Sequence, residues 1–195
     1  MPSAFAQPFL YWVGMDTDPR TTPEALADFN RFYSGTHVYE VMAAHPGFVG
    51  VSRYELVEQD PRGGEHAGPR WLAVYEMADE AAAEQYVKDN ARPWLHRQRY
   101  SPWPPARKRA KTVWRMIWRQ HSTHELPIDS VLLVGLNNLP SNLPEGGTCY
   151  ELYRAFAHPA PGCPSFCLIL PATQDRPTPD ATWRLVYDRI PPPAD

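Results

Sequence analysis

Features that direct a protein to membranes, nucleic acids or an oxidising compartment are scarce in this sequence. Its net charge of −3 gives no general attraction for nucleic acids or acidic membranes, and no apolar run approaches the roughly 20 residues that span a bilayer. The first 16 residues contain no basic leader and are interrupted by Pro8, so we expect no signal peptide. The three cysteines, all beyond residue 148, make no disulfide framework. We therefore expect a cytoplasmic protein with reduced thiols.

Sequence motifs for phosphate, metal and covalent chemistry are absent as well. There is no Gly-rich phosphate loop, no GxSxG and no HExxH. Cys149, His158, Cys163 and Cys167 are possible zinc ligands, but their spacing fits no common zinc finger. Cys167 lies in an apolar run, where a buried free thiol is ordinary. We expect neither a metal nor a cofactor.

Aromatic residues, in contrast, are abundant: the 195 residues include seven Trp, ten Tyr and seven Phe. Each of these side chains buries much apolar area, so they can build a compact core or line a flat ligand pocket. The shares of hydrophobic residues (43%) and charged residues (21%) are those of a globular protein with a real core.

The first 121 residues alternate between strand and helix patterns. Thr22, Pro23 and Glu24 mark a helix start with a hydroxyl cap, a proline and an early acid. His45-Pro46-Gly47 ends that helix, and Ser34-Gly35 within it predicts a break or kink. The predicted elements are a strand at 9–15, a helix at 22–45, strands at 48–57 and 70–77, a helix at 78–90 and a strand at 112–121.

This order is that of a ferredoxin-like α+β module, to which we assign residues 1–122. The sheet of such a module carries helices on one face only, so its other face needs a partner. We assign residues 123–195 to a partial second ferredoxin-like repeat, because Trp183–Arg189 parallels Trp71–Met77.

The second module looks shortened. Within it we expect a strand at Leu132–Pro140, a brief helix at Cys149–Pro159 and a strand at Pro164–Leu170. We expect no second helix and no fourth strand, since the chain ends in Pro-Pro-Pro-Ala-Asp.

Three stretches resemble the dimeric α+β barrel superfamily, in particular its EthD-like and tandem-repeat branch. They are Tyr33–Val41, His45–Tyr54 and Pro69–Glu76. The resemblance implies two ferredoxin-like sheets that close into a barrel, between subunits or between tandem halves, with a small organic molecule bound between sheet and helices. Known relatives include polyketide cyclases, muconolactone-type isomerases, cofactor-independent monooxygenases and haem enzymes. We therefore expect a dimeric α+β barrel and a homodimer.

His37 is the leading catalytic candidate, because an imidazole titrates near neutral pH and can exchange a proton with a substrate in a partly dry pocket. Tyr33 lies one turn before it and Glu40 within a turn after it, so the three can form a hydrogen-bonded set. The alternative is a structural histidine bonded to a backbone carbonyl at the kink.

Polar residues within the strands are candidates for binding a substrate carboxylate or enolate, because they are costly to bury unpaired. Ion pairs or plain exposure would explain them as well. On or after the second helix, the resemblance to plant polyketide cyclases implies a Tyr and a His. Tyr86 fits, but Arg92 stands where the His is expected, and His96 can replace it only if the segment bends suitably. The candidate substrate-binding residues are Arg53, Glu76, Tyr86, Trp94, His96, Arg115 and Arg119.

A basic stretch from Lys88 to Arg119 holds ten of the nineteen Lys and Arg residues and is interleaved with aromatic ones. Such a stretch can bind single-stranded nucleic acid, an anionic substrate or an acidic carrier protein. A solvated connection between helix and strand is the simpler interpretation, so we expect no nucleic acid and no membrane as a partner.

Together these features predict a small-molecule enzyme of secondary metabolism or aromatic catabolism. It would cyclise, isomerise or dehydrate a polyketide-like or aromatic substrate without a cofactor, with His37 as acid or base and with Tyr33 and an arginine orienting an oxyanion. Two alternatives stay open: a non-catalytic ligand-binding or scaffold protein, and a cofactor-free or haem monooxygenase.

Overall fold

Eight strands and two helical stretches make up the described part of the chain. The computed structural model describes residue 5 and residues 7–59, 68–92, 100–122, 129–144, 146–157, 163–173 and 181–192. In chain order the elements are β1 (Phe9–Thr17), α1 (Pro23–Phe32), the π-helical segment η1 (Tyr33–His37), α2 (Val38–Ala44), β2 (Phe48–Gln59), β3 (Trp71–Met77), α3 (Glu80–Asn90), the 3₁₀ turn η5 (Pro105–Arg109), β4 (Ala110–Ser122), β5 (Ser130–Leu136), β6 (Thr148–Ala157), β7 (Phe166–Pro171) and β8 (Ala181–Ile190).

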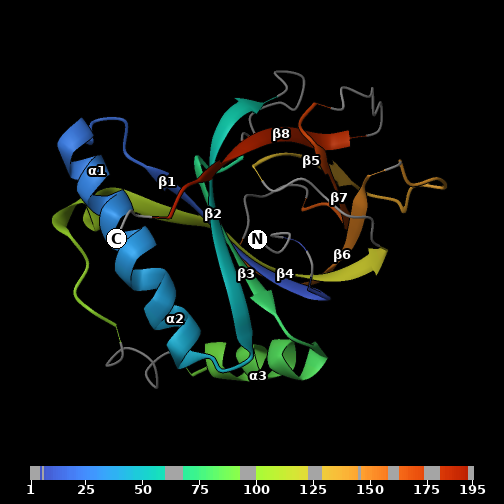
Figure 1. The fold of residues 1–195 in the computed structure, drawn as a ribbon, viewed down its shortest axis with the longest axis horizontal. Helices are drawn as coiled ribbons and strands as arrows, with labels where there is room; N and C mark the ends of the chain where they lie inside the picture. Colours follow the sequence, from blue (N-terminus) through green and yellow to red (C-terminus); the bar gives the residue numbers. More distant parts are fainter. Residues whose placement is uncertain are drawn as a thin grey trace.

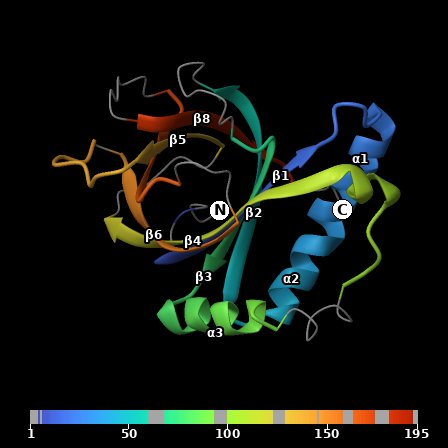
Figure 2. The ribbon, with the colours of Figure 1, turned by 180° about the vertical axis from the view of Figure 1, so that it is seen from behind.

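The strands form one closed antiparallel barrel in the order β1-β3-β2-β8-β5-β7-β6-β4 (Figure 1). Read from β4, the order is β4-β1-β3-β2 followed by β8-β5-β7-β6, so the second set of four repeats the order of the first. The two sets join where β2 pairs with β8 and where β4 pairs with β6. Figures 1 and 2 show the labelled helices on the side of the first set. Closure leaves no exposed sheet edge.

The predicted fold class, a dimeric α+β barrel of ferredoxin-like modules, is wrong, and so is the resemblance to the EthD-like branch that suggested it. The first six long elements do follow the predicted order. The second half, however, adds four strands and, in its described residues, no helix. These strands pair with both edges of the first sheet, so an eight-stranded barrel closes within one chain. Sequence patterns indicate the elements but not which edges will pair, and the pairing decides the fold class.

Two predictions for the second half are also wrong. The segment predicted as a brief helix is strand β6, in which Tyr150 and Leu152 alternate toward the barrel interior. The second half therefore has four strands where three were expected: β6 is the additional one, whereas the stretch Trp183–Arg189, which parallels strand Trp71–Met77, does form β8 between β5 and β2. The strand predicted at Pro164–Leu170 is confirmed by β7.

Four strands of the barrel, β1, β3, β5 and β7, are buried on both faces, which explains why they read as continuous apolar runs. Alternate side chains fill the barrel interior. Phe5 also lies there, with its ring stacked on Tyr54 at 5.8 Å, and its carbonyl accepts a hydrogen bond from the Tyr150 hydroxyl at 2.8 Å. The interior core includes four tryptophans: Trp12, Trp114, Trp118 and Trp183. The intervening side chains of β1, β3 and β4 form a second core against the helices.

The first helical stretch runs unbroken from α1 through η1 to α2, where Ser34-Gly35 had predicted a break or kink. Between Tyr33 and His37 the helix widens into a π turn, in which the Val38 N–H bonds to the Tyr33 carbonyl. The additional residue shifts the buried stripe, which passes from Phe29 and Tyr33 to Val38. His37 is therefore displaced to the edge of the stripe. Such π segments occur frequently at functional sites.

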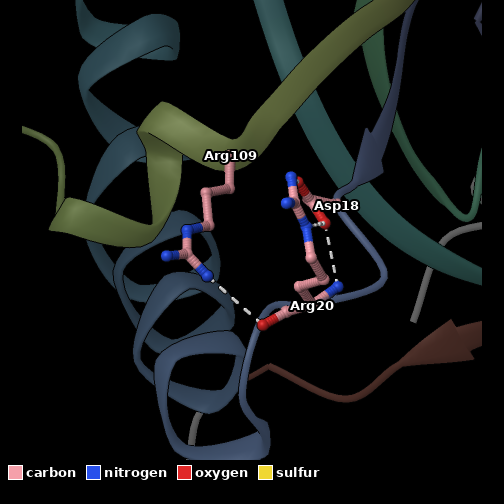
Figure 3. A network of polar contacts seen from close by, with 3 residues as sticks. All are labelled: Asp18, Arg20 and Arg109. Atoms are coloured by element: carbon pink, nitrogen blue, oxygen red, sulfur yellow. Dashed lines mark hydrogen bonds and ion pairs between the residues drawn. The ribbon is translucent and has the colours of Figure 1, made fainter.

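A polar network ties the turn between β1 and α1 to η5 (Figure 3). The Asp18 carboxylate accepts hydrogen bonds from the Arg20 N–H at 2.9 Å and from the Arg20 guanidinium at 2.6 Å. These bonds hold the pKa of Asp18 well below its usual value. The Asp18 N–H donates to the Arg109 carbonyl at 2.8 Å, and Arg109 donates to the Arg20 carbonyl at 3.3 Å. The network holds η5 beside the start of α1.

The helices of the described chain lack the length and the apolar stretch that crossing a bilayer requires.

Candidate functional site

A cavity of about 310 Å³ lies between the helices and the outer face of the first four strands. Its volume is at the lower end of the range of small-molecule sites. Outward-facing side chains of β1, β3 and β4 form its floor, and η1, α2, α3 and the segment before β4 form its walls. The lining residues are Tyr11, Val13, Met15, Tyr33, His37, Val41, His45, Tyr75, Tyr86, Asp89, Asn90, Tyr100, Trp103, Arg107, Thr112 and Arg115.

His37 reaches this cavity from the π segment. Its ring lies 4.3 Å from the Trp103 ring and 5.3 Å from the Tyr33 ring, measured between centroids. Its Nδ1 is buried 4.0 Å from Glu40 Oε2, and neither atom has a hydrogen-bond partner among the described residues. Nε2 is therefore the atom that can meet a ligand.

Burial keeps the His37 imidazole neutral. It lowers the pKa of His37 from 6.5 to about 4, although the Glu40 carboxylate acts in the opposite direction. A neutral imidazole can accept a proton, and the Glu40 oxygen beside Nδ1 would then stabilise the imidazolium. Glu40 itself is fixed, because its other oxygen accepts hydrogen bonds from the Ser101 N–H at 3.0 Å and from the Ser101 hydroxyl.

Tyrosine side chains extend from His37 across the floor of the cavity. Tyr33 and Tyr75 share a side-chain hydrogen bond. The Tyr75 ring lies 5.9 Å from the Tyr11 ring, and the Tyr11 ring lies 4.5 Å from the Tyr86 ring. Burial raises the pKa of Tyr33, Tyr75 and Tyr86 above the ordinary value. These phenols therefore remain protonated near neutral pH and can donate hydrogen bonds to a ligand oxygen.

Arg115, on β4, ends this row of tyrosines. Its Nε donates to the Tyr11 hydroxyl at 2.9 Å, and its Nη2 donates to the Tyr86 hydroxyl at 3.4 Å and to Asn90 Oδ1. Burial alone would lower the pKa of Arg115, but the neighbouring Tyr11 and Tyr86 outweigh it and the pKa is raised. Arg115 is thus a permanent cation in the cavity floor.

Trp103 and Arg107 close the cavity on the side of η5. The Trp103 ring packs on Phe29 at 5.7 Å and on Tyr33 at 5.5 Å. The Arg107 guanidinium lies 5.3 Å from the centre of the Trp103 ring, and its Nη1 donates to the Ala110 carbonyl at 2.8 Å. This wall is therefore aromatic and positively charged.

His45 and Asp89 occupy the opposite end, where α2 meets α3. His45 Nδ1 lies 3.6 Å from Asp89 Oδ2, and the His45 ring packs edge-on against Tyr86 at 4.9 Å. Gln85 donates to the other Asp89 oxygen at 2.8 Å. Asp89 is the acidic side chain among the lining residues, and it already has these partners.

The structure brings four of the predicted site residues together. The cavity is lined by Tyr33, His37, Tyr86 and Arg115. Trp94 and His96 lie outside the described residues.

The other predicted residues lie elsewhere. Arg53 is buried beneath the helix, where it donates to Ser34 Oγ at 2.7 Å and to Asn30 Oδ1 at 2.9 Å, with its guanidinium 4.2 Å from the Tyr33 ring centre. Glu76 lies on the same face of β3 as Val74, which points toward the barrel interior. Arg119 forms a surface ion pair with Glu151 at 2.7 Å.

Sequence reasoning missed the residues that the sheet contributes to the floor. Tyr11 and Tyr75 sit in apolar strands and read as core residues, because their facing direction becomes known only once the barrel closes. Asn90 looked like a helix end. Trp103 is one of several aromatic residues in the basic stretch, and nothing in the sequence distinguishes it from the others. The signal that could have identified them is the alternation of Phe9, Tyr11 and Val13 opposite Leu10 and Trp12, which separates an outer from an inner face.

The fold and the cavity define a single-chain, eight-stranded antiparallel barrel with an external site lined by tyrosines, histidines and arginines. Comparison with protein-family models and with curated proteins finds no match for this chain. Within the described ranges, no three His, Cys, Asp or Glu side chains gather closely enough to hold a metal ion, and His158 of the possible zinc set lies outside these ranges.

Proposed function

We propose that the protein is a cofactor-independent acid–base enzyme that acts on a small aromatic or polyketide-like molecule in this cavity. The observation that carries the proposal is the presence, in one cavity, of a neutral histidine and a permanently charged arginine joined by a row of tyrosines. Abstraction of a proton next to a carbonyl needs this combination, a base for the carbon-bound proton and donors for the developing oxyanion.

In the proposed reaction His37 Nε2 takes the proton from carbon. The imidazolium that forms lies beside Glu40 Oε2, whose negative charge offsets the cost of a buried cation. Arg115 and the phenols of Tyr11 and Tyr86 donate to the enolate oxygen. Return of the proton to another atom of the substrate gives isomerisation. Attack of the enolate on a second carbonyl forms a carbon–carbon bond and an alkoxide, which takes the proton back from His37, and this gives cyclisation.

The test is proton exchange at carbon. Aryl β-dicarbonyl compounds such as benzoylacetate would be incubated with the protein in D₂O, and loss of the α-proton signal would be followed by NMR. We expect exchange above the buffer rate, and His37→Ala to lower it at least about tenfold without unfolding the protein. His121→Ala is the matched control, because His121 is exposed on β4. Equal exchange rates in the wild type and His37→Ala would refute the catalytic role.

A non-catalytic ligand-binding or scaffold protein is the second candidate. The observation that favours it is the barrel interior, which is filled with packed side chains and, among the described residues, does not hold a ligand site. It predicts ligand retention without exchange. Native mass spectrometry of freshly purified protein would report a retained ligand and the oligomer size together. The homodimer and the cytoplasmic location stay predictions; the barrel itself closes without a second subunit.

A further inference from the structure

Among the described residues, several surface arginines pair with a carboxylate, and the two arginines of the cavity do not. Four arginines outside it each lie within ion-pair distance of a carboxylate: Arg20 with Asp18, Arg31 with Asp28, Arg70 with Glu55 and Arg119 with Glu151. The two cavity arginines, Arg107 and Arg115, have no carboxylate partner among the residues that the structure describes. Their hydrogen-bond partners there are a backbone carbonyl, two phenols and an amide, and their guanidinium groups lie over the Trp103 and Phe156 rings.

Arg115 has donor capacity left. A guanidinium carries five N–H groups, and Arg115 donates its hydrogen bonds from Nε and Nη2. In the described part of the chain Nη1 therefore has no acceptor. Tyr11, Tyr86 and Asn90 hold the guanidinium plane from one side, so the remaining N–H groups are fixed in direction before a ligand arrives.

Burial makes this unpaired charge consequential. A half-buried cation without a counter-ion loses hydration and regains little from neutral partners. An anion beside it is held by charge-assisted hydrogen bonds, which are about twice as strong as neutral ones. Asp89 is unsuited to the role of counter-ion, because it lies against His45 and Gln85.

We propose that the ligand of this cavity is an aromatic anion, with a carboxylate or enolate oxygen pair bound by Arg115 and its ring packed on Trp103. This inference deepens the proposed function, on which it rests, by naming the class of substrate for the same site. The exposed Lys108, Arg109 and Lys111 next to Arg107 extend the positive charge outward and favour the approach of an anion.

The test compares an acid with its neutral isostere. Calorimetric titration with 2-naphthoate and with 2-naphthamide would give the two dissociation constants for the wild type. We expect the acid to bind at least about tenfold more tightly. Arg115→Gln should weaken binding of the acid by about 10- to 100-fold and binding of the amide by less than about threefold. Arg107→Gln should weaken binding of the acid less, since the Arg107 guanidinium is partly engaged by the Trp103 ring. Arg119→Gln, which removes an equal charge far from the cavity, is the control.

Equal binding of acid and amide by the wild type would overturn the inference. The same loss in Arg119→Gln as in Arg115→Gln would also overturn it, because the effect would then be one of net charge. If Arg115→Gln fails to fold, Arg115→Lys is tested in its place. It keeps the positive charge but not the planar guanidinium, so it should retain part of the preference for the acid.

The outcomes separate this inference from the proposed function. If the His37→Ala variant loses proton exchange but still binds the acid more tightly than the amide, both the proposed function and the anion site are supported. His37→Ala with unchanged exchange, together with a strong preference for the acid in the wild type, refutes the catalytic role of His37 and leaves the anion site in place.

Discussion

Two buried titratable groups, His37 and Glu76, give the folded protein opposite dependences on pH. Burial lowers the pKa of His37 from 6.5 to about 4, and burial raises the pKa of Glu76 from 4.5 to about 7, although Arg189 opposes the rise. On unfolding both groups return to their ordinary pKa values. Between these limits the unfolded chain binds a proton at His37 that the folded protein lacks, and the folded protein binds a proton at Glu76 that the unfolded chain lacks.

The signs follow from this proton count. The stability contributed by neutral His37 is complete above pH 6.5 and is lost as the pH falls through about 4; its full size is roughly 3 kcal/mol. The stability contributed by neutral Glu76 is complete below pH 4.5 and is lost as the pH rises through about 7. Its size is roughly 2 kcal/mol, after allowance for the water that still reaches the carboxyl. In the wild type the two slopes largely cancel.

Urea denaturation of the wild type, His37→Gln and Glu76→Gln at about pH 5 and about pH 7.5 separates the two groups. Relative to the wild type, His37→Gln should become more stable on acidification by about 2 kcal/mol, because only the Glu76 slope remains. Glu76→Gln should become less stable on acidification by a similar amount. An NMR titration in which His37 titrates near its ordinary pKa, or parallel pH profiles for all three proteins, would refute the reasoning.

Local sequence patterns predicted the elements of the first half well. The cap at Thr22, the helix end before His45-Pro46-Gly47 and the four strands all occur near the expected residues. The long-range pairing was not predictable, because β2 with β8 and β4 with β6 are contacts between distant apolar strands with no sequence signature of register. Misreading β6 as a helix removed a strand from the second half and left the barrel open.

The candidate site was predictable in part for the same reason. His37, Tyr33, Tyr86 and Arg115 carry polar chemistry at positions where a core residue would be apolar, and they share the cavity. Arg53 carries the same signal but uses its charge beneath the helix. A single sequence does not distinguish a buried charge that holds the structure from one that waits for a ligand, because both cost desolvation and both need partners.

Two further predictions concern packing. Arg53→Met should lower the free energy of unfolding by about 1–3 kcal/mol, because it leaves Asn30 and Ser34 without their donor. The control Arg119→Met should lower it by less than about 1 kcal/mol. Thermal and urea denaturation would measure both variants, and equal losses would contradict the buried role of Arg53. Gly135→Ala should lower the free energy of unfolding by about 1–3 kcal/mol, because a Cβ there would lie 2.6 Å from the Trp183 ring. Gly50→Ala should lower it less, because the nearest contact of a Cβ there is the flexible end of Glu76 at 3.2 Å. The same stability in both variants would contradict the tight packing at Gly135.

The two sides of the cavity belong to different layers, and this decides what controls the chemistry. Tyr75, Tyr11 and Arg115 stand on the neighbouring strands β3, β1 and β4, whose ladders fix them as one rigid floor. His37 stands on a helix, so its distance from Arg115 depends on how the helix packs on the sheet.

Arg53 is the polar anchor of that packing, since it rises from β2 and binds the residues that flank the start of the π turn. Arg53→Met should therefore move the His37 resonances and lower proton exchange, while 2-naphthoate, whose carboxylate is bound by Arg115 of the floor, still binds. A variant that loses naphthoate binding and exchange together, with its fold intact, would show that the floor is not rigid and that the two sides of the cavity are coupled.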